Sequence, residues 1–442
     1  MTFVVIFICL VFLILLISYF KVDAFLSLVV VSIAMALFLG IPPERIPVAV
    51  EKGIGDILGN LTLIIVLGAM LGKLTAESGA AQKIAEVMVG VMGKKNIQWG
   101  LMIAGFIVGI PLFYGVGFVL LVPIIFSVVY QYKYPAVYIG LPMLASLSVA
   151  HGFLPPHPSP AALVGMFNAN MGITLILGII VAIPAIILAG PVFSKTLKNI
   201  KTGPLKLFET KKPESDRNHT LPSKINSFGS ATLPVFLLIA VTVIPYFIPV
   251  GESRASGIMS LLSAPSMVML LSLIIATYTL GIRQKYRIKE IMGIYSEAVK
   301  DIAMILLIIA GSGIFKEVME TSGVSLQLAG EMDKLPVHPL ILGWMMAGII
   351  RGCVGSATIA ALTAAGVMLP LAAHAGTNPN LMVLSLGAGS LLFSHVNDSG
   401  FWLFKEYFNL SIKDTLRSWS VMEIIVSVVG LAGVLILNAV FF

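Results

Sequence analysis

The chain has 442 residues, of which 58% are hydrophobic and 11% are charged, and its mean hydropathy is +1.01. Soluble domains carry about 25% charged residues, so this composition excludes an ordinary soluble protein and indicates an integral membrane protein. The net charge of +7 does not indicate a nucleic-acid partner, because the Lys and Arg residues are scattered between apolar segments and form no single patch.

The first apolar segment, residues 3–20, lacks a basic n-region and a small-residue cleavage site, so we expect a retained first helix rather than a signal peptide. The two cysteines, Cys9 and Cys353, have no paired spacing. The sequence therefore predicts neither a disulfide framework nor a metal cluster, and we expect no cofactor.

Apolar segments long enough to cross a membrane follow one another along the chain. A hydrocarbon core about 30 Å thick needs roughly 20 apolar residues per helix. The predicted crossings are 3–20, 23–41, 61–76, 136–166, 171–192, 230–250, 262–282, 301–317, 381–404 and 419–442. Two further apolar stretches, 99–130 and 339–370, carry Gly, Pro or small residues at their middle. We expect each of them to be a re-entrant hairpin that enters and leaves the membrane on one side.

The basic residues predict the orientation in a plasma (bacterial inner) membrane. If both termini lie outside, nearly all Lys and Arg residues of the connecting segments fall inside, as the positive-inside rule requires. The bases left outside are Arg45, Lys52, Arg254 and Lys334. The polar, Lys-rich segment 194–228 is then a cytoplasmic linker.

Two halves of the chain share a register. At an offset of 244 positions, residues 78–79 and 322–323 are both Ser-Gly, and His151 overlays His395. Both halves also share one order of elements, namely helix, interfacial segment, hairpin, broken helix and helix. This order predicts an all-α, inverted-repeat secondary transporter, the alternative being an accidental similarity between two apolar halves. The predicted parts are a first repeat 1–192, a linker 193–229 and a second repeat 230–442.

Two polar segments, HGFLPPHPSP at 151–160 and HVNDSG at 395–400, break predicted crossings. Non-helical backbone survives at membrane depth only when it is buried in protein or lines a wet cavity, and paired breaks mark a carrier's binding site. The candidate substrate-binding residues of the breaks and hairpin tips are Tyr114, Gly115, His151, His157, Ser159, Ser356, Thr358, His395, Asn397 and Ser399.

Several roles stay open for these side chains. The histidines can titrate near neutral pH, bind a hydroxylated substrate or lock the broken backbone, and a zinc site is disfavoured because HExxH spacing is absent. Ser159 and Ser399 put hydroxyl groups near half-helix N-termini, where partial positive charge favours a carboxylate. Glycines such as Gly115 permit close backbone approach to a ligand, or serve plain helix packing.

Two charged residues stand out. Asp398 lies within the second break, where a carboxylate is costly and functional by default, so we predict that it carries a coupling proton. The alternative is a helix cap or a partner for a buried histidine. Arg351 has two interpretations, a bidentate partner for an anionic substrate or a snorkelling side chain at a hairpin base.

The chain resembles the gluconate permease (GntP) family of proton-coupled sugar-acid carriers over nearly its whole length. The resemblance rests on GIPLFYGVGFVLLVPI at 109–124, HGFLPPHPSPAALV at 151–164, RGCVGSATIAALTAAG at 351–366 and SHVNDSGFW at 394–402. It implies the fold of the ion-transporter superfamily, in which a moving transport domain works against a scaffold, and it implies a homodimer. The hairpin tip at 355–358 lacks the Asn of sodium-coupled relatives.

We therefore expect a symporter that imports gluconate or a related sugar acid together with a proton. Its partners are that small molecule, the proton and the lipid bilayer, with no nucleic acid. D-serine or another small hydroxy or amino monocarboxylate is the alternative substrate within the family. An intramembrane hydrolase using Ser159 or Ser399 with a histidine, and a passive channel, are the alternatives from other classes.

Overall fold

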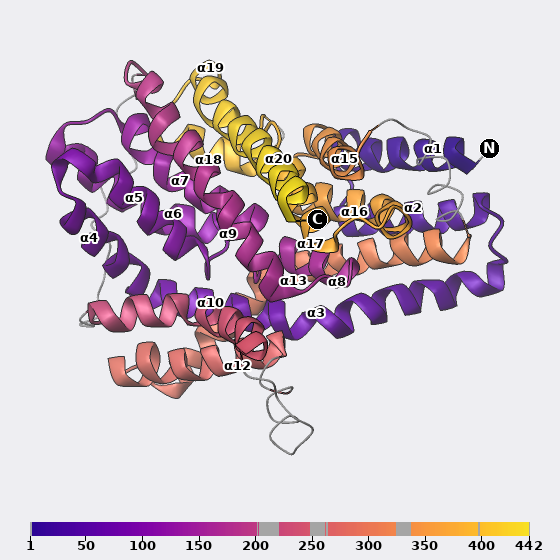
Figure 1. The fold of residues 1–442 in the computed structure, drawn as a ribbon, viewed down its shortest axis with the longest axis horizontal. Helices are drawn as coiled ribbons and strands as arrows, with labels where there is room; N and C mark the ends of the chain where they lie inside the picture. The colour runs from indigo at the N-terminus through magenta and orange to yellow at the C-terminus, as the bar shows by residue number, and fades with distance from the viewer. Residues whose placement is uncertain are drawn as a thin grey trace.

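The computed structural model describes residues 2–200, 202, 221–247, 261, 264–323, 337–396 and 398–441, and within these ranges all regular structure is helical. Its α-helices are α1 (Thr2–Ile14), α2 (Ala24–Phe38), α3 (Ile46–Glu77), α4 (Ala80–Met92), α5 (Ile97–Gly109), α6 (Tyr114–Tyr132), α7 (Ala136–Phe153), α8 (Pro158–Met166), α9 (Met171–Ile187), α10 (Lys224–Phe247), α12 (Pro265–Ala276), α13 (Ile288–Thr321), α15 (Pro339–Val354), α16 (Ala357–His374), α17 (Pro379–Ser390), α18 (Ser399–Tyr407), α19 (Ile412–Thr415) and α20 (Val421–Phe441). Figure 1 shows their arrangement.

The chain is an all-helical, multi-pass membrane protein. Within the described residues, 7 helical segments are long and apolar enough to cross a membrane, or 8 if a pair bent by 45° is counted as one span. They are Tyr114–Tyr132, Ala136–Met166, Met171–Leu197, Lys224–Ile244, Pro265–Gln284, Ile288–Thr321 and Ile412–Phe441, with Pro43–Gly59 and Leu61–Glu77 as the bent pair. Shorter apolar helices cover Val4–Ile17, Ala24–Phe38, Pro339–Val354 and Ala357–Ala373.

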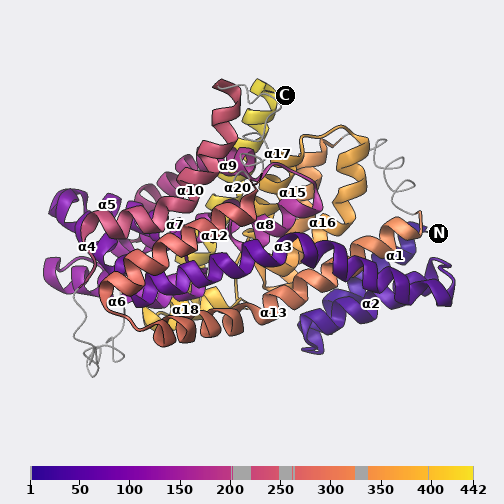
Figure 2. The same cartoon turned by 90° about the horizontal axis from the view of Figure 1, so that it is seen from below.

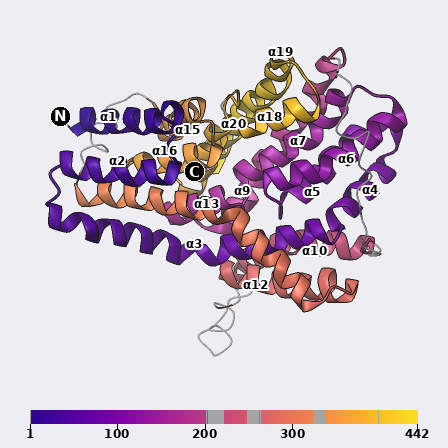
Figure 3. The same ribbon diagram turned by 180° about the vertical axis from the view of Figure 1, so that it is seen from behind.

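The longest helices, α3 with 32 residues and α13 with 34, pack side by side (Figures 1 and 3). The predicted crossing 61–76 matches the second part of the bent pair, Leu61–Glu77, whereas the predicted crossing 301–317 was too short, because α13 begins at Ile288. Two lysines of α3 pair with acidic residues of α13. Lys52 Nζ lies 2.8 Å from Glu317 Oε2, and Lys73 Nζ lies 3.0 Å from Asp301 Oδ2.

Glycines let α3 and α13 approach closely. A Cβ atom added to Gly53 would lie 2.6 Å from the carbonyl oxygen of Gly313, and one added to Gly313 would lie 2.3 Å from that of Gly53. Only glycine fits such a backbone contact. On the other side of α3, helix α12 packs against both α3 and α10 (Figure 2).

Helices α5 and α15 each contact a later helix at a glycine. Helix α5 contacts α7 at Gly105, where an added Cβ would lie 2.4 Å from the carbonyl oxygen of Met143. Helix α15 contacts α17 at Gly389, where an added Cβ would lie 2.3 Å from the carbonyl oxygen of Trp344. Each of these two contacts thus depends on a residue without a side chain.

Both predicted breaks are present, with shifted bounds. The first covers residues 154–157 between α7 and α8, where Pro155 and Pro156 cannot continue the helix, so Ser159 is helical rather than in the break. The second falls between α17 and α18, and Ser399 likewise opens α18.

Some predicted features lie elsewhere or outside the described residues. Helix α10 begins at Lys224, inside the predicted linker. Of the linker, residues 203–220 lie outside the described residues, as do Arg254, Lys334 and Asn397.

Candidate functional site

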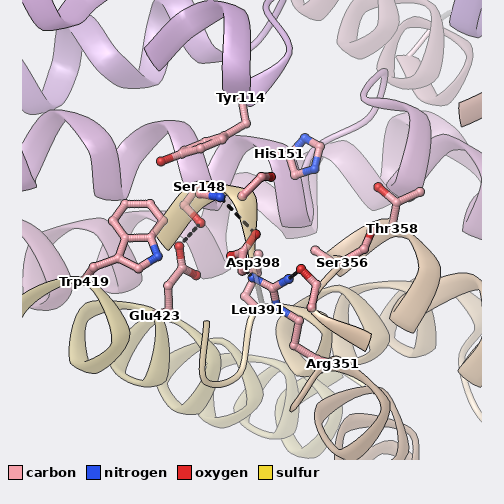
Figure 4. A pocket seen from close by; sticks show the side chains of 14 residues that line it. Tyr114, Ser148, His151, Arg351, Ser356, Thr358, Leu391, Asp398, Trp419 and Glu423 are labelled. Carbon is pink, nitrogen blue, oxygen red and sulfur yellow. Dashed lines mark hydrogen bonds and ion pairs between the residues drawn. The ribbon is translucent and has the colours of Figure 1, made fainter. Parts of the chain in front are cut away.

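A cavity of about 150 Å³ lies where both halves of the chain meet (Figure 4). The start of α6, the end of α7, the α15–α16 turn, the start of α18 and the segment that leads into α20 enclose it. Its lining residues are Tyr114, Ser148, His151, Arg351, Gly355, Ser356, Ala357, Thr358, Leu391, Asp398, Ser399, Gly400, Trp419 and Glu423.

A buried ion pair occupies one wall. Arg351 donates from Nη2 to Asp398 Oδ2, and from Nη1 to the carbonyl oxygen of Gly355 at 2.5 Å. The side chains of Arg351 and Asp398 are 4% and 11% exposed. The snorkelling interpretation of Arg351 is therefore wrong, because its guanidinium group points into the protein and is fixed by the hairpin turn and the second break.

Asp398 also caps α18, which was the alternative role considered for it. Its Oδ1 accepts from the Gly400 backbone N–H at 3.0 Å, and its Oδ2 accepts from the Ser394 hydroxyl group in addition to Arg351. Trp419 Nε1 donates to Ser394 Oγ at 2.8 Å and so extends this network. Both oxygens of Asp398 are hydrogen-bonded, and its charge has a partner.

A second buried carboxyl group faces the cavity from α20. Glu423 is 2% exposed, and its Oε1 accepts from the Ser148 hydroxyl group of α7 at 2.6 Å. Its Oε2 has no hydrogen-bond partner. Figure 4 shows Glu423 beside Ser148, on the same side of the cavity as Trp419.

Two helix N-termini open onto the cavity. Helix α16 begins at Ala357, after Ser356, whose Oγ accepts from the Ile359 backbone N–H at 3.4 Å. Helix α18 begins at Ser399, and both starts belong to the lining. The helix dipole favours an anion at such positions, and at α18 the Asp398 carboxylate already lies there.

Unpartnered polar groups concentrate here. Among the described residues, six buried side-chain atoms have no hydrogen-bond partner, and four belong to residues that line this cavity. They are Tyr114 Oη, His151 Nδ1, Arg351 Nε and Glu423 Oε2. Because buried polar groups are normally paired, this concentration points to a polar ligand. No group of His, Cys, Asp or Glu side chains in the described ranges is arranged to hold a metal ion.

Some of the predicted site residues line the cavity and others do not. His157 and His395 instead fasten the breaks to the hairpins, because His157 Nε2 lies 2.5 Å from the Gly109 carbonyl oxygen and His395 Nε2 lies 2.8 Å from that of Gly352. Ser159 is buried in α8. Among the predicted substrate-binding residues, Tyr114, His151, Ser356, Thr358 and Ser399 do line the cavity, whereas Gly115 does not.

Sequence reasoning missed Ser148, Trp419 and Glu423. Glu423 lies inside a predicted crossing, and a carboxyl group in an apolar run is a signal in itself, but its place near the start of that crossing suggested an interfacial residue. Trp419 and Ser148 carry no local signal that separates them from ordinary membrane-helix residues.

Comparison with known proteins identifies relatives along the whole chain. The sequence profile described as GntP family permease matches residues 1–440. The "High-affinity gluconate transporter" of Escherichia coli (strain K12) is 44% identical over 441 residues, which cover 100% of each chain. The "Gluconate permease" of Bacillus subtilis (strain 168) and the "Gnt-II system L-idonate transporter" of E. coli are each 43% identical, over 95% of both chains.

Two solved structures share the fold. The YdaH transporter of Alcanivorax borkumensis aligns with a TM-score of 0.64 at 15% identity, over 94% of this chain and 97% of the other. MtrF of Neisseria gonorrhoeae aligns with a TM-score of 0.64 at 12% identity, over 96% of each chain. At these identities the likeness concerns the fold alone.

Proposed function

Because the chain belongs to the GntP permease family, we propose that it imports gluconate or a related sugar acid into the cell together with a proton. Membership in this transporter family means that the chain is not an enzyme, so the intramembrane-hydrolase alternative is wrong. The relatives described as gluconate and L-idonate transporters support a sugar acid as the substrate. D-serine or another small monocarboxylate is the alternative that a substrate panel tests.

The proposed architecture is an inverted repeat of residues 1–192 and 230–442 joined by a cytoplasmic linker. The ends of α3 and α13 support it, because each helix is followed by Ser-Gly with the glycine at positive φ, +78° for Gly79 and +69° for Gly323. The half-helices α8 and α18 support it further. Each has nine residues and is followed by Phe and a left-handed Asn, with φ of 50° at Asn168 and 48° at Asn409.

The hydrogen bonds of two histidines refine the register of this repeat. His157 and His395 bind the carbonyl oxygens of Gly109 and Gly352, and these two glycines are 243 positions apart, close to the offset of the repeat. By this criterion the counterpart of His395 is His157, rather than the predicted His151. His151 lines the cavity instead, and its Nδ1 has no hydrogen-bond partner.

In this proposal α5–α6 and α15–α16 are re-entrant hairpins, and α7–α8 and α17–α18 are broken helices. Together they form a transport domain that moves against a scaffold containing α3 and α13 by an elevator mechanism, in a homodimer in the bacterial inner membrane. Helix α6 is long enough to cross the membrane alone. The hairpin assignment rests on its packing with α7, which parallels that of α16 with α17.

The cavity is the proposed substrate site. A single observation carries this assignment: the cavity brings a buried arginine, two helix N-termini and four residues with unpartnered polar atoms around about 150 Å³. Arg351 and the start of α16 supply positive charge for a carboxylate. Tyr114, His151 and Thr358 supply polar groups for the hydroxyl groups of the sugar chain. The sequence-based assignment of the coupling proton to Asp398 stays a prediction.

Binding of labelled gluconate to the purified protein tests the site. We expect gluconate and L-idonate to compete with the label, D-serine to compete weakly and glucose, which lacks the carboxylate, not to compete. Arg351→Gln combined with Asp398→Asn keeps a neutral, similarly shaped pair. We expect it to weaken binding roughly 10- to 100-fold, since hydrogen bonds to charged groups contribute about 1.5–3 kcal/mol. Wild-type affinity in this variant would move the substrate to another site.

A further inference from the structure

We propose that Glu423, rather than Asp398, binds the coupling proton, an inference that rests on the proposed proton-coupled function. The first ground is the surroundings of the carboxyl group. Glu423 is 2% exposed, and its Oε2 has no partner. The ion pairs formed within the described ranges do not involve it. A buried carboxylate without a cation is costly, and the group avoids this cost by binding a proton.

The surroundings of Asp398 are the opposite. It accepts hydrogen bonds from Arg351, from the Ser394 hydroxyl group and from the Gly400 backbone N–H. Protonation of Asp398 would abolish its ion pair and leave Arg351 as a buried, unpaired cation, which is strongly unfavourable. The hydrogen bonds and the ion pair of Asp398 therefore argue against it as the residue that binds and releases the proton.

Few other titratable groups face Glu423. The helices α7, α9, α15 and α17 and the segments Leu188–Val192 and Leu416–Ser420 pack against α20. Helices α9 and α17 and the segment Leu188–Val192 carry no titratable side chain, and Arg417 of the segment Leu416–Ser420 is exposed. Helix α7 contributes His151 and α15 contributes Arg351, while Asp398 and Tyr114 face the cavity from the starts of α18 and α6. Ser148 accommodates both forms of Glu423, because its hydroxyl group donates to the carboxylate and accepts from the carboxylic acid.

Charge balance then links the proton to the substrate. With Asp398 and Arg351 cancelling, an ionised Glu423 leaves the cavity with one negative charge, which repels an anionic sugar acid. A protonated Glu423 leaves it neutral and receptive. The empty, deprotonated site and the site loaded with proton and sugar acid then carry the same net charge. Proton and substrate thus favour each other's binding, and linkage requires this effect to be reciprocal.

The test compares three proteins in proteoliposomes, namely the wild type, Glu423→Gln and Asp398→Asn. The glutamine mimics the protonated acid, so we expect Glu423→Gln to exchange labelled for unlabelled gluconate across the membrane without accumulating it under a pH gradient. Wild-type affinity for gluconate should fall about tenfold per pH unit once Glu423 is ionised, and the affinity of Glu423→Gln should not change with pH. Glu423→Asp retains a carboxyl group and should accumulate gluconate.

Each outcome decides a claim. Accumulation of gluconate by Glu423→Gln with wild-type pH dependence overturns the inference. The inference is also overturned if Asp398→Asn, and not Glu423→Gln, exchanges gluconate without accumulating it. A wild type that accumulates no sugar acid overturns the proposed function itself. If Glu423→Gln does not fold, infrared spectra decide: the wild type should show a protonated carboxyl band that gluconate preserves to higher pH and that Glu423→Asp shifts. A band that Glu423→Asp leaves in place contradicts the inference.

Discussion

The ion pair between Arg351 and Asp398 makes a quantitative prediction. Both side chains are buried, 4% and 11% exposed, so removal of either partner leaves an uncompensated charge inside the protein. Such a removal costs about 3–5 kcal/mol, far more than the loss of an exposed pair. We therefore expect Arg351→Gln and Asp398→Asn each to destabilise the protein by about this amount, and the double variant to be more stable than the sum of the two effects implies. The favourable coupling should be about 0.5–3 kcal/mol.

Thermal unfolding in detergent, followed by size-exclusion chromatography of the surviving protein, measures the order of stabilities. The matched control is Lys83→Gln, which removes the pair between Lys83 and Glu86, whose side chains are 28% and 42% exposed. An exposed pair contributes about 0–1 kcal/mol, so the control variant should unfold at about the same temperature as the wild type. Additive losses in the double variant, or single variants as stable as the control, would refute the reasoning.

Three further predictions concern packing, the breaks and topology. Gly53→Ala should destabilise the protein by about 1–3 kcal/mol, because its Cβ would lie 2.6 Å from a carbonyl oxygen of α13. The control Gly55→Ala should not destabilise it, because nothing lies within 4 Å of that added Cβ. Equal melting midpoints for the two variants would contradict this prediction. His157→Phe and His395→Phe should each destabilise the protein by about 0.5–1.5 kcal/mol, since each removes a hydrogen bond to a backbone carbonyl oxygen. Unchanged stability in both variants would remove the fastening role. Ser215→Cys should resist an impermeant thiol reagent added outside intact cells and react in inverted vesicles, and labelling from outside would overturn the orientation.

The sequence predicted those parts of the fold that have local signals. Pro155 and Pro156 predict the first break without any knowledge of tertiary contacts, because proline cannot continue a helix. The Ser-Gly pairs that indicated the repeat lie at the ends of α3 and α13, where Gly79 and Gly323 adopt the left-handed conformation that favours glycine. The starts of these two helices were missed, since the segments before the apolar runs carry several charged residues.

The site was harder to predict because its decisive contacts are tertiary. Arg351 and Asp398 are 47 positions apart, and nothing near either residue shows that they pair. Glu423 and Ser148 are 275 positions apart and come from opposite halves of the chain. The histidines of the breaks were correctly located in sequence, but only the hydrogen bonds separate His157, which fastens the backbone, from His151, which faces the cavity.

The central claim is coupled transport of a sugar acid, and accumulation of labelled gluconate in proteoliposomes tests it most directly. With the interior alkaline and no sodium present, we predict uptake above the equilibrium level that a protonophore abolishes, together with no accumulation under a sodium gradient alone. Uptake that only equilibrates across the membrane would indicate a passive channel. Accumulation that requires sodium, or that occurs for D-serine and not for gluconate, would contradict the proposed coupling or the proposed substrate.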